Sequence, residues 1–171
     1  MATYDASDDL TVYGGWTLGW DTGFEDNMGG NTFIGGFSYA VSEDIGLTYI
    51  TTVGDLGARG GDAYTHSIVA DVTLTDNLNY VFQSDYVRVE ETQDDDVGIN
   101  QYLFYTVNDC LALGGRFEWW KNEGQSQYEA TVGLNYRANA NITVRPEIRH
   151  DFAPFASTEQ TTFGVDAILT F

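Results

Sequence analysis

A chain of 171 residues with 19 Gly, only 2 Pro and 15% aromatic side chains has the composition of β-strands punctuated by glycine rather than of helices. Its 26 acidic residues outnumber 7 basic ones and give a net charge of −19, so the chain cannot neutralise phosphates and nucleic acid is not expected as a partner. No apolar run approaches the ~20 residues of a membrane-spanning helix, and no long window has helical apolar spacing. The length fits a single domain over residues 1–171.

Short polar turns recur at intervals of roughly 31 to 33 residues and divide the chain into hairpins. They lie at Ser42–Asp44, Thr75–Asn77, Asn108–Asp109 and Ala138–Asn141. Alternating apolar and polar residues between these turns and longer polar loops predict ten strands. In chain order the expected strands are about Leu10–Asp21, Asn31–Val41, Ile45–Val53, Tyr64–Leu74, Leu78–Arg88, Ile99–Val107, Leu111–Trp119, Tyr128–Tyr136, Ile142–Phe152 and Phe163–Phe171. Each is ~9–12 residues long, as a tilted strand needs to cross a bilayer, whereas soluble strands average ~5–6.

This layout predicts an all-β fold, a ten-stranded antiparallel up-and-down transmembrane β-barrel of the bacterial outer membrane. An even number of strands leaves both termini beside the short turns, which would be periplasmic, and places the long acidic loops outside the cell. The last strand should pair with the first, because lipid cannot satisfy an open sheet edge. Residues 1–9 contain no export signal, so the chain is expected either to be the mature form of an exported protein with an added Met or not to be exported at all.

The two faces of the expected strands differ. One face is apolar, and the other carries mainly Gly, Ser, Thr and Asn without any lysine, whereas the solvent face of a soluble barrel is normally rich in Lys and Glu. From residue 111 onward the polar face becomes charged, and strands ~4.8 Å apart allow a cross-strand ladder that fills a barrel interior. The expected residues of the lumen or constriction are Arg116, Glu118, Glu129, Arg137, Arg145, Glu147, Arg149, Asp151 and Asp166.

Aromatic residues gather at both ends of the apolar face, with smaller aliphatic residues between them. This is the two-girdle pattern of a membrane barrel, so the lipid bilayer and its lipopolysaccharide are expected partners. The expected girdle comprises Trp16, Trp20, Tyr39, Tyr80, Tyr105, Trp119, Tyr136 and Phe171. Phe171 also closes an alternating final strand, which resembles the C-terminal signal that the bacterial barrel-assembly machinery reads.

Three segments of the second half resemble the OmpL-like β-barrel porin family: Asn77–Asp85, Gly114–Trp120 and Ile142–Asp151. The last, Arg-Pro-Glu-Ile-Arg-His-Asp from residue 145, carries most of the likeness. The resemblance spans roughly residues 75–171 and implies an outer-membrane barrel, with the family's inward charged positions at Arg116, Glu118, Arg145, Glu147, Arg149 and Asp151. Two features depart from the family: its members are generally longer, and His150 replaces the usual aromatic residue.

The leading functional hypothesis is a passive porin-like channel for ions or small solutes. Ten strands enclose a narrow interior, so flux would be small. Arg116, Arg145 and Arg149 opposite Glu118, Glu147 and Asp166 would set a transverse field at a constriction.

The alternative hypothesis is a plugged barrel without conductance, which anchors or scaffolds an oligomer or a membrane complex. An enzyme is not expected, and no catalytic residue, metal ligand or cofactor is assigned. His66 and His150 fall on the lipid-facing register, and the chain has neither a nucleophile-elbow motif nor metal-ligand spacing.

Overall fold

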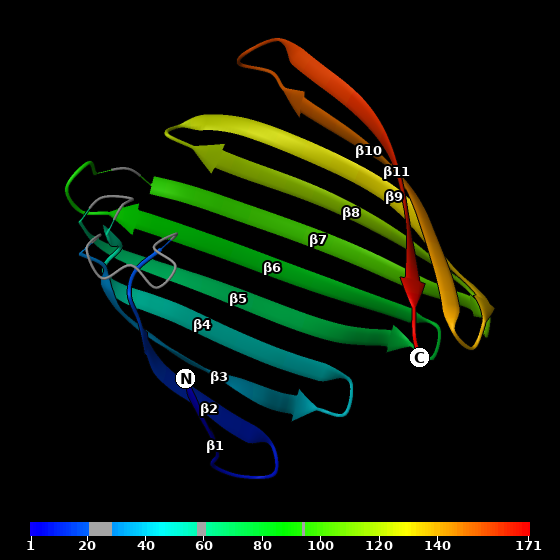
Figure 1. Ribbon diagram of the computed structural model, residues 1–171, viewed down its shortest axis with the longest axis horizontal. Helices are drawn as coiled ribbons and strands as arrows, with labels where there is room; N and C mark the ends of the chain where they lie inside the picture. Colours follow the sequence, from blue (N-terminus) through cyan, green and yellow to red (C-terminus); the bar gives the residue numbers. More distant parts are fainter. Residues whose placement is uncertain (21–28, 58–60, 94) are drawn as a thin grey trace.

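The computed structural model describes residues 1–20, 29–57, 61–93 and 95–171. In these ranges eleven antiparallel strands follow one another as neighbours in a single curved sheet (Figure 1). The strands are β1 (Ala2–Asp5), β2 (Leu10–Thr17), β3 (Asn31–Ser42), β4 (Ile45–Asp55), β5 (Asp62–Thr75), β6 (Leu78–Val89), β7 (Asp95–Asn108), β8 (Leu111–Asn122), β9 (Gln125–Asn139), β10 (Ile142–Ala153) and β11 (Thr158–Leu169). No helix in the described part of the chain is long and apolar enough to span a membrane.

The all-β antiparallel meander is confirmed, but the expected count of ten strands is wrong by one. The missed strand, β1, precedes a fifth short turn, Ser7–Asp9. All five turns share one hydrogen bond, in which a side-chain oxygen accepts from the backbone N–H two residues later. The backbone amides donate to the side chains as follows: Asp9 to Ser7, Asp44 to Ser42, Asn77 to Thr75, Cys110 to Asn108 and Asn141 to Asn139, at 2.9–3.4 Å.

The expected pairing of the last strand with the first is not found among the described residues. In the described residues β11 pairs with β10 alone, and Figure 1 shows β1 and β11 at separate edges of the sheet. β1 lies along the outer edge of β2, from Ala2 opposite Gly14 to Asp5 opposite Thr11. Because β1 and β11 run in the same direction in a meander, an antiparallel closure would need that edge of β2, which β1 occupies.

Two strand ends differ from the expected ends for local reasons. β2 stops at Thr17, because Gly19 adopts a left-handed backbone with φ 98° and the Trp20 amide donates to the carbonyl of Leu56 instead of continuing the ladder. The expected end of that strand, Asp21, lies outside the described residues. Conversely, β8 and β9 extend to a two-residue turn at Glu123 and Gly124, both with positive φ, where a longer loop was expected.

The sheet is a single layer with almost no buried core. Among the described residues, the buried hydrophobic side chains are Leu56 and Ala63. Large apolar side chains on the convex face are instead exposed, with Trp16 63%, Val132 68% and Phe163 68% accessible. So much exposed apolar surface is unsuited to water and suits lipid. The convex face therefore has the character expected of a lipid-facing surface.

Most of the expected girdle residues lie on this convex face, and two lie beyond the strand ends. Trp20 is in the bend after β2, and Phe171 follows the end of β11. The remaining six, Trp16, Tyr39, Tyr80, Tyr105, Trp119 and Tyr136, belong to β2, β3, β6, β7, β8 and β9. Their contact with lipid headgroups and the reading of Phe171 by assembly machinery stay predictions.

At Gly36 the neighbouring strand leaves no room for a side chain. Gly36 stands opposite Ile50 in β4, and a Cβ atom there would overlap the carbonyl oxygen of Tyr49 and lie 2.9 Å from the Cα of Ile50. Backbone atoms cannot move aside without disturbing the ladder, so only glycine fits. Gly46 in β4 has no heavy atom within 4 Å of an added Cβ.

We predict that Gly36→Ala lowers the free energy of unfolding by about 1–3 kcal/mol, the usual cost of overpacking. Gly46→Ala, the same change at an open strand position, should cost nothing measurable, because alanine reduces the freedom of the unfolded chain. Urea unfolding of both variants in lipid vesicles measures the difference. Equal destabilisation by the two variants would contradict the assigned packing of β3 on β4.

Candidate functional site

Cross-strand register arranges the concave side of β7 to β11 in rows of residues that face one another. Three rows follow one another from the long-loop end toward the short turns, and we name them by their content. The acidic row is Asn100, Glu118, Glu129, Asp151 and Gln160; the arginine row is Tyr102, Arg116, Thr131, Arg149 and Thr162; and the glycine row is Phe104, Gly114, Gly133, Glu147 and Gly164. One step further, Arg145 stands opposite Asp166.

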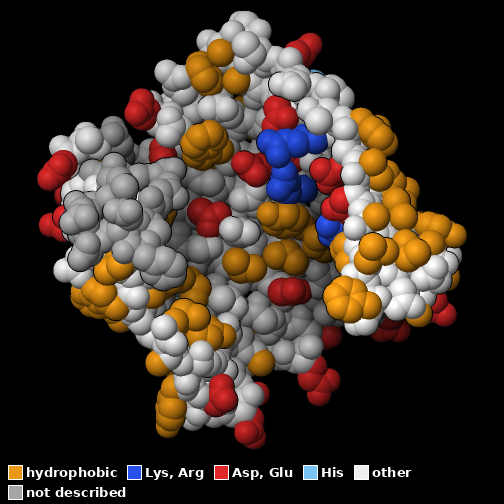
Figure 2. Space-filling view, in the orientation of Figure 1, with side chains coloured by type: hydrophobic (Ala, Val, Ile, Leu, Met, Phe, Trp, Pro, Cys, Tyr) orange, Lys and Arg blue, Asp and Glu red, His pale blue; other side chains and the backbone are white. Residues whose placement is uncertain are grey.

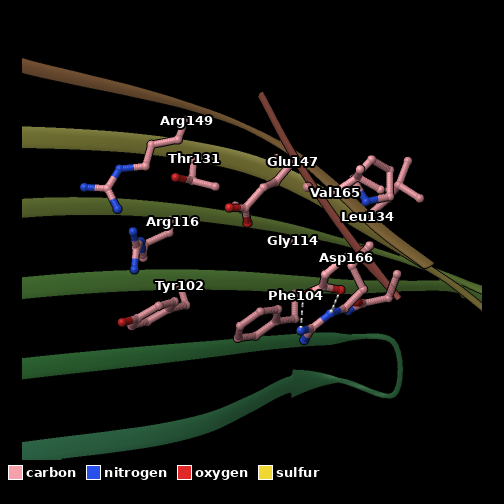
Figure 3. A pocket seen from close by; sticks show the side chains of 16 residues that line it. Tyr102, Phe104, Gly114, Arg116, Thr131, Leu134, Glu147, Arg149, Val165 and Asp166 are labelled. Atoms are coloured by element: carbon pink, nitrogen blue, oxygen red, sulfur yellow. Dashed lines mark hydrogen bonds and ion pairs between the residues drawn. The ribbon is translucent and has the colours of Figure 1, made fainter. Parts of the chain in front are cut away.

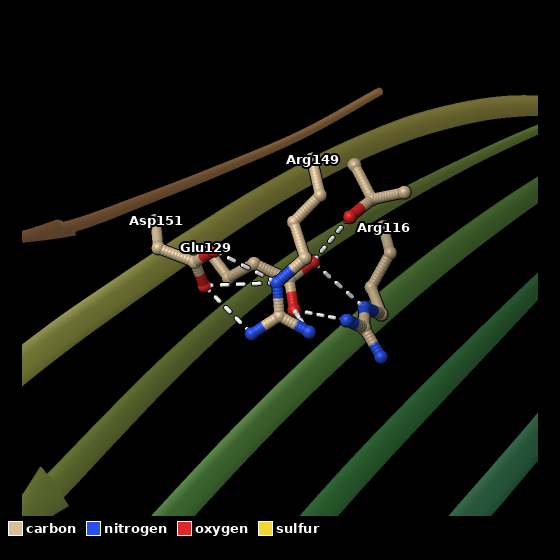
Figure 4. Close-up of polar contacts among 5 residues, drawn as sticks. Arg116, Glu129, Arg149 and Asp151 are labelled. Atoms are coloured by element: carbon tan, nitrogen blue, oxygen red, sulfur yellow. Dashed lines mark hydrogen bonds and ion pairs between the residues drawn. The ribbon is translucent and has the colours of Figure 1, made fainter. Parts of the chain in front are cut away.

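Glu129 is the centre of this arrangement (Figure 4). It is only 3% exposed, and Arg116 donates to both of its carboxylate oxygens, through Nε at 3.0 Å and through Nη2. Arg149 Nη1 lies 3.2 Å from its Oε2, and the Thr131 hydroxyl donates to its Oε1. A carboxylate this buried needs such partners, because an unpaired buried charge is costly.

Arg149 joins the acidic and arginine rows a second time. Its Nε and Nη2 donate to the carboxylate of Asp151, two residues along the same strand, at 2.6–2.9 Å. The guanidinium is 44% exposed, so this fork borders water rather than a sealed core. The result is a network in which two arginines bridge two carboxylates from neighbouring strands.

Glu118 differs from the other acids of its row. It stands directly opposite Glu129, yet no hydrogen bond or ion pair among the described residues involves its carboxylate. Like charges opposite one another in a sheet repel. Arg116 and Arg149 lie one row away and offset this repulsion through Glu129.

The remaining charged residues expected in the lumen are one tight ion pair, Arg145 with Asp166, and two residues whose side chains have no such partner among the described residues, Glu147 and Arg137. Arg145 donates through Nε and Nη2 to Asp166 at 2.8 and 2.6 Å. The Glu147 side chain has no hydrogen bond or ion pair within the described part of the chain, and neither has the side chain of Arg137, which is exposed at the short-turn end of β9.

The sequence predicts that the arginines face Glu118, Glu147 and Asp166 across a constriction and so create a transverse field. The structure has a different arrangement. Each of Arg116, Arg145 and Arg149 is forked onto a carboxylate of its own or an adjacent strand. The charges are thus balanced along one wall, over a few ångströms, instead of facing each other across an opening. We call this concave-facing set the charged wall: Arg116, Glu118, Glu129, Arg145, Glu147, Arg149, Asp151 and Asp166.

The charged wall borders a hollow of about 610 Å³. In Figure 2 the arginine and acidic side chains gather in this hollow, whereas apolar side chains cover the neighbouring outer edge. Figure 3 shows Glu147, Arg116 and Arg149 turned into the hollow, with Tyr102 and Phe104 along its other side. The hollow exists because glycine supplies three of the five positions in the glycine row.

Sequence reasoning missed the aromatic residues of the concave face. Tyr102 and Phe104 line the main hollow, and Trp120 lines a smaller one beside Glu118. The signal was available, because Tyr102 and Phe104 follow Asn100 at intervals of two and so share its face.

Neither histidine belongs to the concave face. Nδ1 of His66 forms a hydrogen bond with the Tyr64 hydroxyl at 3.1 Å, and Nδ1 of His150 forms one with the Thr161 hydroxyl at 2.9 Å. Both histidines are at strand positions that face the convex side. The described residues contain no group of three or more His, Cys, Asp or Glu side chains that could hold a metal ion.

A curved sheet with an apolar convex face and a charged concave face defines the wall of a transmembrane β-barrel protein. The comparisons with known proteins specify the class: the chain belongs to the family described as "Putative beta-barrel porin-2, OmpL-like", which it matches over residues 1–171. Such a porin resides in the outer membrane, and membership of a porin family indicates a non-enzymatic barrel.

A solved structure has the same fold. It is OmpT (in-vitro folded), an outer membrane protein of Vibrio cholerae, with a TM-score of 0.62 and 14% sequence identity. The match covers 98% of this chain and 62% of that one, so the chain spans less than two thirds of its structural relative. No curated protein matches the sequence.

We predict that Glu129→Gln lowers the free energy of unfolding by about 2 kcal/mol, because Arg116 and Arg149 lose their shared counter-charge. Glu118→Gln is the matched control, because Glu118 stands directly opposite Glu129 in the ladder. It removes the same charge from a carboxylate that has no hydrogen bond or ion pair among the described residues. Its effect should stay within about 0.5 kcal/mol. Urea unfolding in vesicles measures both, and a loss for Glu118→Gln as large as for Glu129→Gln would refute the central role of Glu129.

Proposed function

We propose that this chain forms the wall of a passive outer-membrane channel for ions and small solutes, with the charged wall facing an aqueous lumen. One observation carries the proposal: charged side chains occupy the concave face, and large apolar side chains the convex one. Arg145 and Arg149 are each nearly half exposed, which suits a wet interior. Water in the lumen also limits the cost of holding so many charges.

The channel requires a closed barrel, because lipid cannot hydrogen-bond the open edges of β1 and β11. We propose that both edges are paired in the membrane. The diameter of a barrel grows with its number of strands: ~8 strands leave an interior filled by side chains, and ~16 leave an aqueous channel. The hollow on the concave side of the eleven described strands supports a lumen that side chains do not fill.

The surroundings of the barrel follow from the same orientation. The convex aromatic residues would contact lipid headgroups and lipopolysaccharide, and Phe171 would engage the barrel-assembly machinery. The short turns would lie on the periplasmic side, and the acidic loops outside the cell.

A plugged barrel that anchors or scaffolds a membrane complex is the second candidate. The observation that favours it is the forking of Arg116, Arg145 and Arg149 onto carboxylates, which would make the charged wall rigid. The two candidates differ in one property, which is whether a continuous water path crosses the folded barrel.

Planar-bilayer recording of the refolded protein should give discrete current steps that grow in proportion to KCl conductivity. Gly114→Trp, which fills the glycine row, should reduce the unit conductance at least about twofold, because conductance follows the open cross-section of the pore. Gly115→Trp is the matched control. Successive side chains of a strand point to opposite faces, so a tryptophan at position 115 would point to the convex face and not into the hollow. A folded, inserted protein without current steps would establish the plugged barrel instead.

A further inference from the structure

We propose that the hollow beside the charged wall contains a subsite for a small organic cation, formed by the carboxylate of Glu147 and the aromatic rings of Tyr102 and Phe104. The inference deepens the proposed function and rests on it, because it assigns the class of solute that the channel favours. The arginines in the hollow are paired with carboxylates, whereas the carboxylate of Glu147 has no such partner among the described residues and lies in an open space.

The arginines of the hollow are engaged by carboxylates. Arg116 donates twice to Glu129, Arg145 twice to Asp166, and Arg149 to both Asp151 and Glu129. A solute anion would have to compete with these charge-assisted forks, which are among the stronger polar contacts in proteins. The arginines therefore organise the wall more than they attract anions.

The carboxylate of Glu147 faces the hollow, where Arg145 attracts it without forming an ion pair with it. It has no hydrogen bond or ion pair with any described residue, and Figure 3 shows it pointing into the hollow. The added Cβ positions of Gly133 and Gly164 lie 3.2 and 3.4 Å from its aliphatic carbons, so glycine on both sides keeps the space around it open. The charged groups that line the hollow itself are Arg116, Arg145 and Arg149 with Glu147 and Asp166, and of these five Glu147 alone has no hydrogen bond or ion pair with a described residue.

Tyr102 and Phe104 supply the apolar part of the subsite. Their rings lie 6.1 Å apart between centroids and within 12° of parallel, and Phe104 is 42% exposed. Phe104 shares the glycine row with Glu147, separated from it by Gly114 and Gly133 alone. Its ring lies 3.4 Å from where a Cβ of Gly114 would be, so the two glycines form a floor between an aromatic ring and a carboxylate.

This combination selects an organic cation over a metal ion. Calcium takes six to eight oxygen ligands, and one free carboxylate cannot supply them. Aromatic faces attract ammonium groups through the ring quadrupole and recognise quaternary ammonium ions in particular. The volume of the hollow, about 610 Å³, accommodates such a solute.

Choline is the probe, with 3,3-dimethylbutan-1-ol as its uncharged isostere and acetate as the anion. Saturation-transfer NMR on the refolded protein in detergent should detect choline binding that is at least about threefold tighter than binding of the isostere or of acetate. Glu147→Gln should weaken choline binding about threefold or more, as should Phe104→Leu. Glu43→Gln, which removes one charge at the remote turn between β3 and β4, should leave the affinity unchanged.

Equal binding of choline and its isostere, tighter binding of acetate, or full affinity in Glu147→Gln would each overturn the subsite. The comparison of choline with its isostere uses the unaltered protein, so it decides the question even if a variant does not fold. KCl currents from the same preparation separate the two claims. Currents without choline binding overturn the subsite and leave the channel, whereas choline binding without currents supports the subsite and overturns the channel.

Discussion

Every other feature of this protein depends on one constraint: a single-layered sheet must satisfy its backbone hydrogen bonds internally while its two faces meet different surroundings. Strand alternation with a period of two separates those faces residue by residue. On the convex side this exposes Val132 and Phe163, which need lipid, and on the concave side it exposes Arg149, which needs water. Membership of a β-barrel porin family agrees with this division. The open edges of β1 and β11 are the part of the constraint that the sheet leaves unmet.

The charged wall stabilises the curved sheet and also determines the character of its hollow. Glu129 can be buried because two arginines and a threonine surround it, and this joins β8, β9 and β10. Because the arginines are held by carboxylates, the hollow is not basic despite its three guanidinium groups. Among the carboxylates that line this hollow, that of Glu147 has no hydrogen bond or ion pair with a described residue, and it shares its row with an aromatic ring and glycines. The same ion pairs that rigidify the wall therefore leave a preference for cations.

Much of the fold could be predicted from the sequence, because it is encoded locally. The short turns repeat a side-chain to backbone hydrogen bond that Ser, Thr, Asn and Asp form readily, and they located four hairpin turns. The turn at Ser7-Asp8-Asp9 has the same pattern, so the first strand was also predictable from the sequence. Partner choice in the charged wall was not predictable: Arg116 bonds Glu129 diagonally rather than its direct neighbour Thr131. Such choices depend on side-chain reach, which alternation does not encode.

Thiol labelling of neighbouring residues in β9 tests the division of the faces most directly. In a Cys110→Ser background, Thr131→Cys on the concave face and Val132→Cys on the convex face are placed in lipid vesicles and exposed to a membrane-impermeant maleimide. The account predicts that Cys at position 131 reacts, because it lines a wet lumen, and that Cys at position 132 is protected by lipid. Protection at 131 with reaction at 132 would contradict the orientation of the sheet, and with it the lumen.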